Sequence, residues 1–411
     1  MTAALIVAAL AMLGILIRPW RISEAWWSAG GALALVLIGA VSPVNAVRAI
    51  GGGTDVLLFL AGMTALAAFA RGEGVFDRAA ALAVAAAGGS RMRLFAIVYG
   101  VGVITTALLS NDAAIVVLTP AVIVAVRRAG LPPAAYVMAC ALVANAASTL
   151  LPIANPANLL FYPGRVPRLD AWFGAFALAS IAAIVLTYLV LIAVYYRDEL
   201  RGPITVRNAD PQPVSPRRAA LVMLACSAVV LIVVAARGGA IGATAAVLGL
   251  AALALGATRG RTAAREIVGG VGWSVIVMTA GLFVILGAFD NAGAAELPRA
   301  MFAWAQTLPP FIAAPAVALA ATLASNVVTN LPVGLEFGRH LAALHPPAAL
   351  NAAALVGVDI GPNLTLNGSL ATFLWLAILR RNGVPMTAGR FALVGILATP
   401  PALIAAALLV R

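Results

Sequence analysis

The segment LLSNDAAIVVLTPAVIVAV, Leu108–Val126, is almost wholly apolar and yet carries Asn111 next to Asp112. Burying a carboxylate and an amide in apolar surroundings costs free energy unless other polar groups bind them. The chain has 411 residues, of which 63% are hydrophobic and only 10% charged, and apolar runs of about 20 residues, enough to cross a bilayer, recur throughout. The sequence therefore predicts an all-α polytopic membrane protein, because the strands of a membrane β-barrel would alternate apolar and polar residues.

The positive charges of the chain are arginines scattered in short loops. All 26 basic residues are Arg, and the net charge is +12. A nucleic-acid partner requires a basic stripe or patch, which scattered arginines do not form, so we expect no such partner. Cys140 and Cys226 lie inside apolar runs, and we expect them to be buried free thiols. The cysteines show no disulfide or metal-binding spacing, and we predict no metal site and no cofactor.

Ten apolar runs predict transmembrane spans. They lie near 2–17, 25–41, 55–70, 133–162, 171–196, 219–236, 240–257, 273–289, 349–379 and 388–410. Two further runs, 92–127 and 311–340, are each interrupted by a polar pair, Ser110–Asn111 in the first and Ser325–Asn326 in the second. We interpret each of these runs as a re-entrant hairpin, which enters the membrane and turns back within it.

The two halves of the chain resemble one another. FLAGMTALAAF (59–69) resembles MTAGLFVILGAF (278–289), LLSNDAAIVVLTP (108–120) resembles LASNVVTNLP (323–332), and IANPANLLF (153–161) resembles TLNGSLATF (365–373). Such weak duplication, with interrupted hydrophobic segments at corresponding places, indicates a secondary transporter. We predict a first inverted repeat at 1–197, a connecting loop at 198–217 and a second repeat at 218–411. Each repeat should contain about five transmembrane helices, one of them broken, and one re-entrant hairpin.

The arginines also predict the orientation of the chain. An odd number of spans in each repeat inverts the second half relative to the first. If the central loop is cytoplasmic, nineteen arginines lie inside and seven outside, which is the bias expected of the cytoplasmic side. Both termini would then lie outside, and we expect a multi-pass protein of the bacterial inner membrane. Counting the hairpins as full spans keeps several of the same loops inside, so the bias favours this topology without proving it.

The hairpins give a structural reason for polar residues at this depth. A reversal inside the membrane leaves helix-end N–H and C=O groups that lipid cannot satisfy. In the simplest interpretation, Ser110, Asn111, Ser325 and Asn326 only cap these groups. An ionisable residue in a transmembrane segment is a functional candidate by default, so Asp112 is the strongest candidate for proton coupling.

Two broken helices supply the other polar residues. STLLPIANPANLL (148–160) places Asn155 and Asn158 around Pro156, and the prolines at 152 and 156 open the helix. GVDIGPNLTLNGSLAT (357–372) is interrupted in the same way and contains Asp359, a second proton-coupling candidate unless it only pins the broken helix. We predict that both breaks face the hairpin tips in a midplane pocket. Its substrate-binding side chains would be Ser110, Asn111, Asn155, Asn158, Ser325, Asn326, Asn330, Asn363, Thr365, Asn367 and Ser369.

The chemistry of the predicted pocket limits the class of substrate that it could bind. Amides and hydroxyls suit a small neutral solute that carries hydroxyl groups. A dianion would require Arg or Lys, and these motifs contain neither. Two cysteines cannot form a three-thiolate site, so we expect oxygen and amide contacts with the substrate.

Three motifs resemble those of a known family. DIGPNLTLNGSLATFLWL (359–376) resembles the C-terminal signature of the ArsB-type arsenite/antimonite efflux permeases of the ion-transporter superfamily. SNDAAIVVLTPAVI (110–123) and SNVVTNLPVGL (325–335) resemble two further motifs, with Thr329 where an Asn is usual. The resemblance covers nearly the whole chain. It implies export of arsenite or antimonite as the uncharged trihydroxide, coupled to protons and in some members assisted by a cytoplasmic ATPase subunit.

Other functions compete with this prediction. The superfamily that the chain resembles also includes sodium–dicarboxylate carriers. These typically show Ser-Asn-Thr at both hairpin tips, whereas this chain has Ser-Asn-Asp and Ser-Asn-Val. A sodium/proton antiporter is the main alternative, because Asp112 and carbonyl oxygens could coordinate a cation. An intramembrane enzyme with Ser110 or Ser148 as nucleophile would need a base, and we expect no His at membrane depth. We therefore predict a transporter and not an enzyme.

Overall fold

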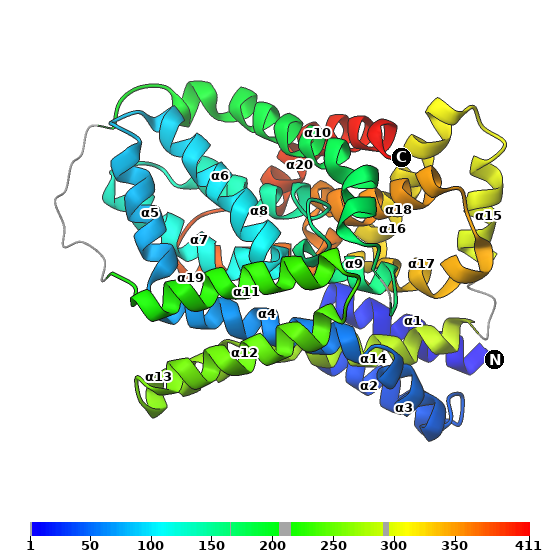
Figure 1. The fold of residues 1–411 in the computed structure, drawn as a ribbon. Helices are drawn as coiled ribbons and strands as arrows, with labels where there is room; N and C mark the ends of the chain where they lie inside the picture. Colours follow the sequence, from blue (N-terminus) through cyan, green and yellow to red (C-terminus); the bar gives the residue numbers. More distant parts are fainter. Residues whose placement is uncertain (1, 165, 205–214, 291–295) are drawn as a thin grey trace.

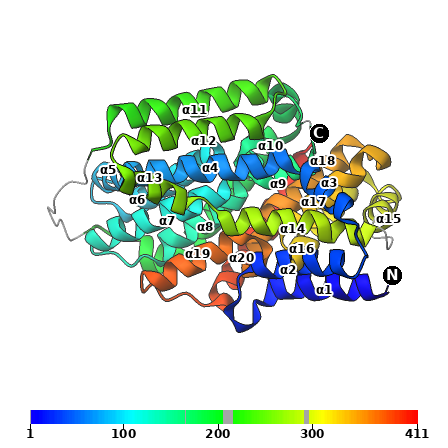
Figure 2. The same ribbon diagram turned by 90° about the horizontal axis from the view of Figure 1, so that it is seen from below.

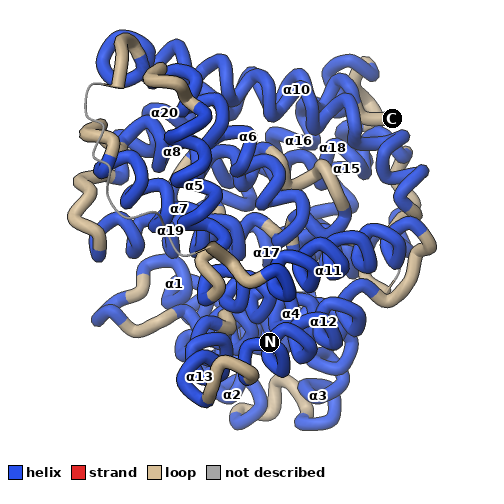
Figure 3. Tube along the Cα trace, turned by 60° about the vertical axis from the view of Figure 1, so that its left-hand side comes forward, coloured by secondary structure: helices blue, strands red, loops and turns tan. Residues whose placement is uncertain are grey.

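The computed structural model describes residues 2–164, 166–204, 215–290 and 296–411, and the regular structure of these residues is helical (Figure 3). The helices of the first half are α1 (Thr2–Ile17), α2 (Glu24–Leu37), α3 (Pro43–Gly52), α4 (Thr54–Gly72), α5 (Val75–Ala86), α6 (Arg91–Leu109), α7 (Asn111–Arg128), α8 (Ala134–Ala146), α9 (Pro156–Phe161) and α10 (Leu169–Tyr195). Those of the second half are α11 (Arg218–Ala236), α12 (Ile241–Ala257), α13 (Arg261–Gly270), α14 (Trp273–Asp290), α15 (Glu296–Ala305), α16 (Pro310–Val328), α17 (Asn330–Leu344), α18 (Ala348–Ile360), α19 (Leu370–Arg381) and α20 (Ala388–Leu409). Residues 205–214 of the predicted connecting loop lie outside the described residues.

The described helices confirm a polytopic all-α membrane protein. Seven are long and apolar enough to cross a bilayer, and they lie at Thr54–Gly72, Arg91–Leu109, Leu169–Leu200, Arg218–Ala236, Arg261–Ala288, Pro310–Val328 and Ala388–Leu409. Shorter apolar helices occur at Ala3–Ile15, Ala134–Ala146, Ile241–Ala257 and Ala348–Leu364. The predicted span 25–41 forms α2, which ends at Leu37 and has only 14 residues. The short connecting helices α3, α5, α13 and α15 were not among the predicted elements.

The order of elements in the second half repeats that of the first. Each half has two apolar helices, a ten-residue helix (α3 or α13), a long helix (α4 or α14), another short helix (α5 or α15), a helical hairpin, a broken helix and a final long helix. Counterparts lie at opposite ends of the bundle: α5 opposite α15 and α13 opposite α3 (Figures 1 and 2). Both chain ends lie at the end of the bundle away from the start of α11 (Figure 1).

Helices of one half pack against helices of the other half, in two corresponding pairs that we call the exchanged pairs. Helix α4 packs against α12, and its counterpart α14 packs against α2. A Cβ atom at Gly62 of α4 would overlap the backbone carbonyl of Ala245, and one at Gly281 of α14 would overlap Ser28. The Ser28 hydroxyl also donates to the Met278 carbonyl at 2.7 Å. Close packing through small residues is the usual means of association in membranes, and here it interlocks the halves.

The second arm of each hairpin likewise packs against the broken helix of the other half. Helix α7, the second arm of the first hairpin, packs against α19, which follows the second break. Helix α17, the second arm of the other hairpin, packs against α9, which follows the first break, and Gly338 lies against the Leu160 carbonyl. Each hairpin therefore supports the broken helix of the other half.

We expect Gly62→Ala and Gly281→Ala each to lower the thermal unfolding midpoint in detergent. The added methyl would force apart α4 and α12 or α14 and α2, and overpacking of this kind costs about 1–3 kcal/mol. Gly30→Ala on α2 is the matched control, because a Cβ there meets nothing within 4 Å. Equal midpoints for all three variants would contradict the close packing of the exchanged pairs.

Candidate transport site

The first hairpin reverses where the sequence predicts it. Helix α6 ends at Leu109 and α7 begins at Asn111. Ser110 between them has φ 73° and ψ 157°, a region that residues other than Gly rarely occupy and that is common at functional sites. Asn111 is fully buried and Asp112 is 6% exposed. The Asn111 Oδ1 atom accepts a hydrogen bond from the Asp112 backbone N–H at 2.8 Å.

The second hairpin reverses one turn later than predicted. Thr329, with φ 69° and ψ 161°, separates α16 from α17, so Ser325 and Asn326 lie in the last turn of α16. The predicted break at this pair is therefore wrong, and the structural counterpart of Asn111 is Asn330. Pro332 explains the difference, because a proline fits the first turn of a helix but disrupts its interior. A break at Asn326 would have placed Pro332 inside the following helix.

The two broken helices resume at matching caps. Asn155 precedes α9, and its Oδ1 accepts from the Ala157 N–H at 3.0 Å. Ser369 precedes α19, and its hydroxyl accepts from the Ala371 N–H at 3.1 Å. Asn155 and Ser369 are thus counterparts, which shifts the sequence alignment of these segments by two residues. Asn158 holds the first break, because its Nδ2 donates to the Ser148 carbonyl at 3.0 Å.

Two side-chain contacts join the breaks across the repeat. Asn155 Nδ2 donates to Asp359 Oδ1 at 2.8 Å. Asn145 Nδ2 donates to Asn363 Oδ1 at 2.9 Å, and Asn363 Nδ2 donates to the Leu142 carbonyl at 2.9 Å. The four side chains of these two contacts are buried. Each first-half residue therefore binds a residue at the break of the second half.

Asn145 is the residue that the sequence analysis missed. It lies ten residues before the cap Asn155, just as Asp359 lies ten residues before the cap Ser369. An alignment anchored on the two caps would therefore have paired Asn145 with Asp359 and identified it.

Side chains of the two hairpins also form hydrogen bonds with residues at or near the breaks. Asn111 Nδ2 lies 3.5 Å from Asn145 Oδ1. In the second half, Asn326 Nδ2 donates to the Gly361 carbonyl at 2.9 Å, and the Thr365 hydroxyl donates to Asn326 Oδ1 at 2.7 Å. Asn111 and Asn326 of the hairpins therefore contact residues at or next to the breaks. Asn367, in contrast, is exposed.

Several buried polar atoms of this region lack a partner within the described residues. They are Asn158 Oδ1, Ser325 Oγ, Thr329 Oγ1 and Asp359 Oδ2. No hydrogen bond or ion pair to the Asp112 carboxylate occurs in the described part of the chain either. Buried polar groups are normally paired, so these oxygens are available to a ligand or a proton. Within the described residues no cluster of three His, Cys, Asp or Glu could hold a metal ion.

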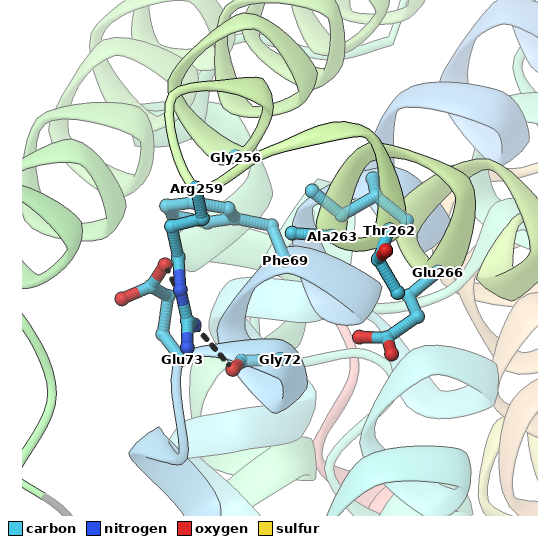
Figure 4. A pocket seen from close by; sticks show the side chains of 9 residues that line it. Phe69, Gly72, Glu73, Gly256, Arg259, Thr262, Ala263 and Glu266 are labelled. Atoms are coloured by element: carbon cyan, nitrogen blue, oxygen red, sulfur yellow. Dashed lines mark hydrogen bonds and ion pairs between the residues drawn. The ribbon is translucent and has the colours of Figure 1, made fainter.

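A cavity of about 220 Å³ lies elsewhere, beside the end of α4. In Figure 4, Arg259 lies beside Glu73 and the Gly72 carbonyl, and Glu266 lies on the opposite wall. Glu73 is bound by Arg217 at 2.6 Å and by Arg259 at 3.4 Å. The hydrogen bonds from Arg217 hold the pKa of the Glu73 carboxyl below its ordinary value. These ion pairs join α4 to the start of α11 and the end of α12, so we regard the cluster as structural.

Comparison with known proteins identifies the family. Residues 6–359 match the family model described as CitMHS, citrate transporter. The chain belongs to this family. The arsenical pump membrane protein of Escherichia coli K12 is 28% identical over 352 residues, which cover 80% of each chain. An uncharacterized transporter of Mycobacterium bovis is 26% identical over 426 residues, covering 96% of this chain and 94% of its own.

A solved structure supports the fold. The YdaH transporter of Alcanivorax borkumensis, whose crystal structure is described as having an unusual topology, has a TM-score of 0.57 at 16% identity and covers 89% of this chain and 86% of its own. At this identity the similarity shows the fold alone. This CitMHS member is therefore a multi-pass membrane transporter of the ion-transporter superfamily and not an enzyme.

The two cysteines of this CitMHS member differ in their surroundings. Cys140 is buried, whereas Cys226 on α11 is exposed. The prediction that both are buried is wrong for Cys226, because an apolar helix at the edge of the bundle leaves one face uncovered by protein. Both are free thiols.

We expect Asn145→Ala to lower the thermal midpoint by leaving Asn363 Oδ1 without its donor. An unpaired buried acceptor costs about 1–3 kcal/mol. Asn45→Ala is the matched control, because the Asn45 side chain makes an exposed hydrogen bond with Arg48 and its loss should change stability by less than about 0.5 kcal/mol. If Asn145→Ala unfolds no earlier than this control, the contact between the breaks does not stabilise the protein.

Proposed function

We propose that this transporter exports trivalent metalloid hydroxides, arsenite and antimonite, from the cytoplasm. The supporting observation is the set of amide and hydroxyl contacts at the two breaks and two hairpins, which are buried at Asn145 and Asn155 and partly buried at Thr365. An Asn side chain can donate to and accept from a hydroxyl group, so such a network suits a small polyhydroxyl solute. The arsenical pump proteins among the relatives support the same substrate class.

Citrate, which the family description names, fits the network less well. A carboxylate is bound best by Arg or Lys, and citrate carries three carboxyl groups. None of the hydrogen bonds described at the breaks comes from a cationic side chain. Asp112 and Asp359 would in addition repel a polyanion when ionised. A neutral solute meets neither obstacle.

Export of a neutral solute needs a coupled ion, because the membrane potential acts only on charge. Asp112 is our proposed proton carrier. It lies at the start of α7, next to the hairpin reversal, and no described side chain neutralises it. Asp359 is bound by Asn155 through one oxygen, so we assign it the role of holding the two breaks together.

We also propose the membrane arrangement predicted from the sequence. The units 1–197 and 218–411 would be inverted repeats, with 198–217 cytoplasmic and both termini outside. The opposite positions of α5 and α15 in the bundle support this division (Figure 1). Proton-driven export needs no ATP, and a cytoplasmic ATPase subunit stays a prediction from the family resemblance.

A sodium/proton antiporter is the second candidate. Asn158 Oδ1 and Asp359 Oδ2 are buried oxygens without described partners, and oxygens are the preferred ligands of hard cations. Unpaired buried oxygens of this kind favour the binding of a cation at the breaks. The two candidates differ in substrate and can be separated by one growth experiment.

We expect cells that lack their own arsenite pump to gain arsenite and antimonite resistance, and to accumulate less of both, when they express this protein. Sodium and lithium tolerance should be measured in the same strains, with an empty vector as control. Unchanged metalloid content together with new sodium or lithium tolerance would support the antiporter instead.

We expect Asp112→Asn to bind or exchange metalloid but to lose uphill transport driven by a pH difference in proteoliposomes. The amide keeps the size of the side chain and cannot carry the proton. Asp170→Asn is the matched control, because the Asp170 side chain is 73% exposed. If Asp112→Asn still concentrates metalloid against its gradient, the proton carrier is another residue, and Asp359 is the next to test.

A further inference from the structure

The turn between α1 and α2 holds an arginine against the helix that follows the second break. The guanidinium carbon of Arg18 lies 3.9 Å from the centroid of the Phe373 ring, well within the range of a cation–π interaction. Only 25% of the Arg18 side chain is exposed. Phe373 lies four residues after the cap Ser369, in the first turn and a half of α19. A residue near the N-terminus therefore reaches the edge of the candidate transport site.

The other side of Arg18 is anchored on different helices. Arg18 Nε lies 3.5 Å from Glu24 Oε2, and 11% of the Glu24 side chain is exposed. The Ser274 hydroxyl donates to Glu24 Oε1 at 3.0 Å. Glu24 begins α2 and Ser274 lies in the first turn of α14, and these two helices pack closely. Arg18 is thus held by the α2–α14 pair on one side and touches α19 on the other.

The two sides belong to separate apolar cores. Ile15 of α1, Leu35 of α2 and Met278 of α14 belong to one buried cluster. Trp375 and Leu379 of α19 belong to the other, together with residues of α6, α7 and α8. The Arg18–Phe373 contact is therefore a side-chain bridge between two packed units.

The backbone of this turn is strained. Arg18 has φ 49° and ψ 53°, and Trp20 has φ 55° and ψ 17°. Both are left-handed conformations that residues other than Gly adopt only when the surroundings hold them, and such residues are frequent at clamps and switches. Helix α2 has 14 residues, whereas its counterpart α12 has 17. The geometry brings Arg18 within reach of α19.

We propose that Arg18 is a latch. Its contact with Phe373 holds α19 against the α1–α2 turn in this conformation, and the contact opens and closes once in each transport cycle. The latch rests on the proposed function only in that the protein must have a transport cycle, whichever solute it carries. Arg18 is accordingly a positioning residue, because it acts through α19 and not on the substrate.

A reversible cross-link tests whether the contact must open. Arg18→Cys and Phe373→Cys are combined in a Cys140→Ser, Cys226→Ala background and joined by a reducible bis-methanethiosulfonate reagent that spans the two lost side chains. We expect cross-linking to lower metalloid or sodium transport at least about tenfold, because conformational steps then limit turnover, and reduction to restore it. Unchanged transport in the cross-linked protein would overturn the latch.

The matched control is a cross-link within the anchor. Glu24→Cys with Ser274→Cys, in the same background, joins α2 to α14 on one side of the latch. We expect the rates of the cross-linked and reduced forms of this control to differ by less than about twofold. A similar block in the control would mean that any cross-link at this depth stops transport, and the latch would again be overturned.

Side-chain variants test the interaction itself. Phe373→Tyr keeps the aromatic face and should transport at the wild-type rate. Arg18→Gln and Phe373→Leu should change the turnover number by about the same factor at constant KM, and the double variant should change it no further, because contacting residues are not additive. Additive effects, or a changed KM, would contradict a latch made by this pair.

Spin labels at positions 18 and 373 give a readout that does not depend on the solute. We expect two distance populations whose ratio changes with pH, sodium or metalloid. A single unchanged distance under all of these conditions would overturn the latch even if metalloid export is confirmed. Two populations in a protein that exports no metalloid would keep the latch and reject only the proposed substrate.

Discussion

The constraint on which this structure depends is that broken helices inside a membrane must satisfy their own polar ends. Lipid offers no hydrogen bonds, so every exposed N–H and C=O at the two breaks and two reversals needs a partner from the protein. Asn155 and Ser369 cap the helices that follow the breaks, and Asn158 and Asn326 bind the carbonyls that the breaks release. The region around the breaks is polar because the backbone requires it.

The exchange of contacts between halves follows from the same constraint. Asn158 binds carbonyls of its own break, whereas Asn145 and Asn155 bind Asn363 and Asp359 of the other half. The glycines of α4 and α14 bring the backbones of the exchanged pairs into contact. The halves therefore stabilise one another, and a substitution at one break should destabilise the other break as well.

Sequence patterns predicted the elements of this fold better than their contacts. Continuous apolar runs and Pro-interrupted segments were enough for the spans, the hairpins and the breaks, because hydrophobicity and missing backbone donors act locally. The reversal at Thr329 was misplaced because the sequence repeats an Asn at 326 and 330, and only the position of Pro332 in the first turn of α17 separates them. Asn145 and Arg18 were missed because their partners are more than 200 residues away, and no local pattern records such a contact. The roles of the candidate site residues in transport stay predictions.

The two halves have the same order of elements but carry charge at different places, and this difference bears on the proposed proton coupling. Asp112 follows Asn111 at the first reversal, whereas Leu331 follows Asn330 at the second. Asp359 precedes the second break, whereas Asn145 occupies the corresponding place before the first. At these corresponding places each half thus carries one buried carboxyl, Asp112 in the first half and Asp359 in the second. Under the proposed proton coupling, protonation of Asp112 would alter one hairpin and leave the other unchanged, and the proton would in this way bias the direction of movement.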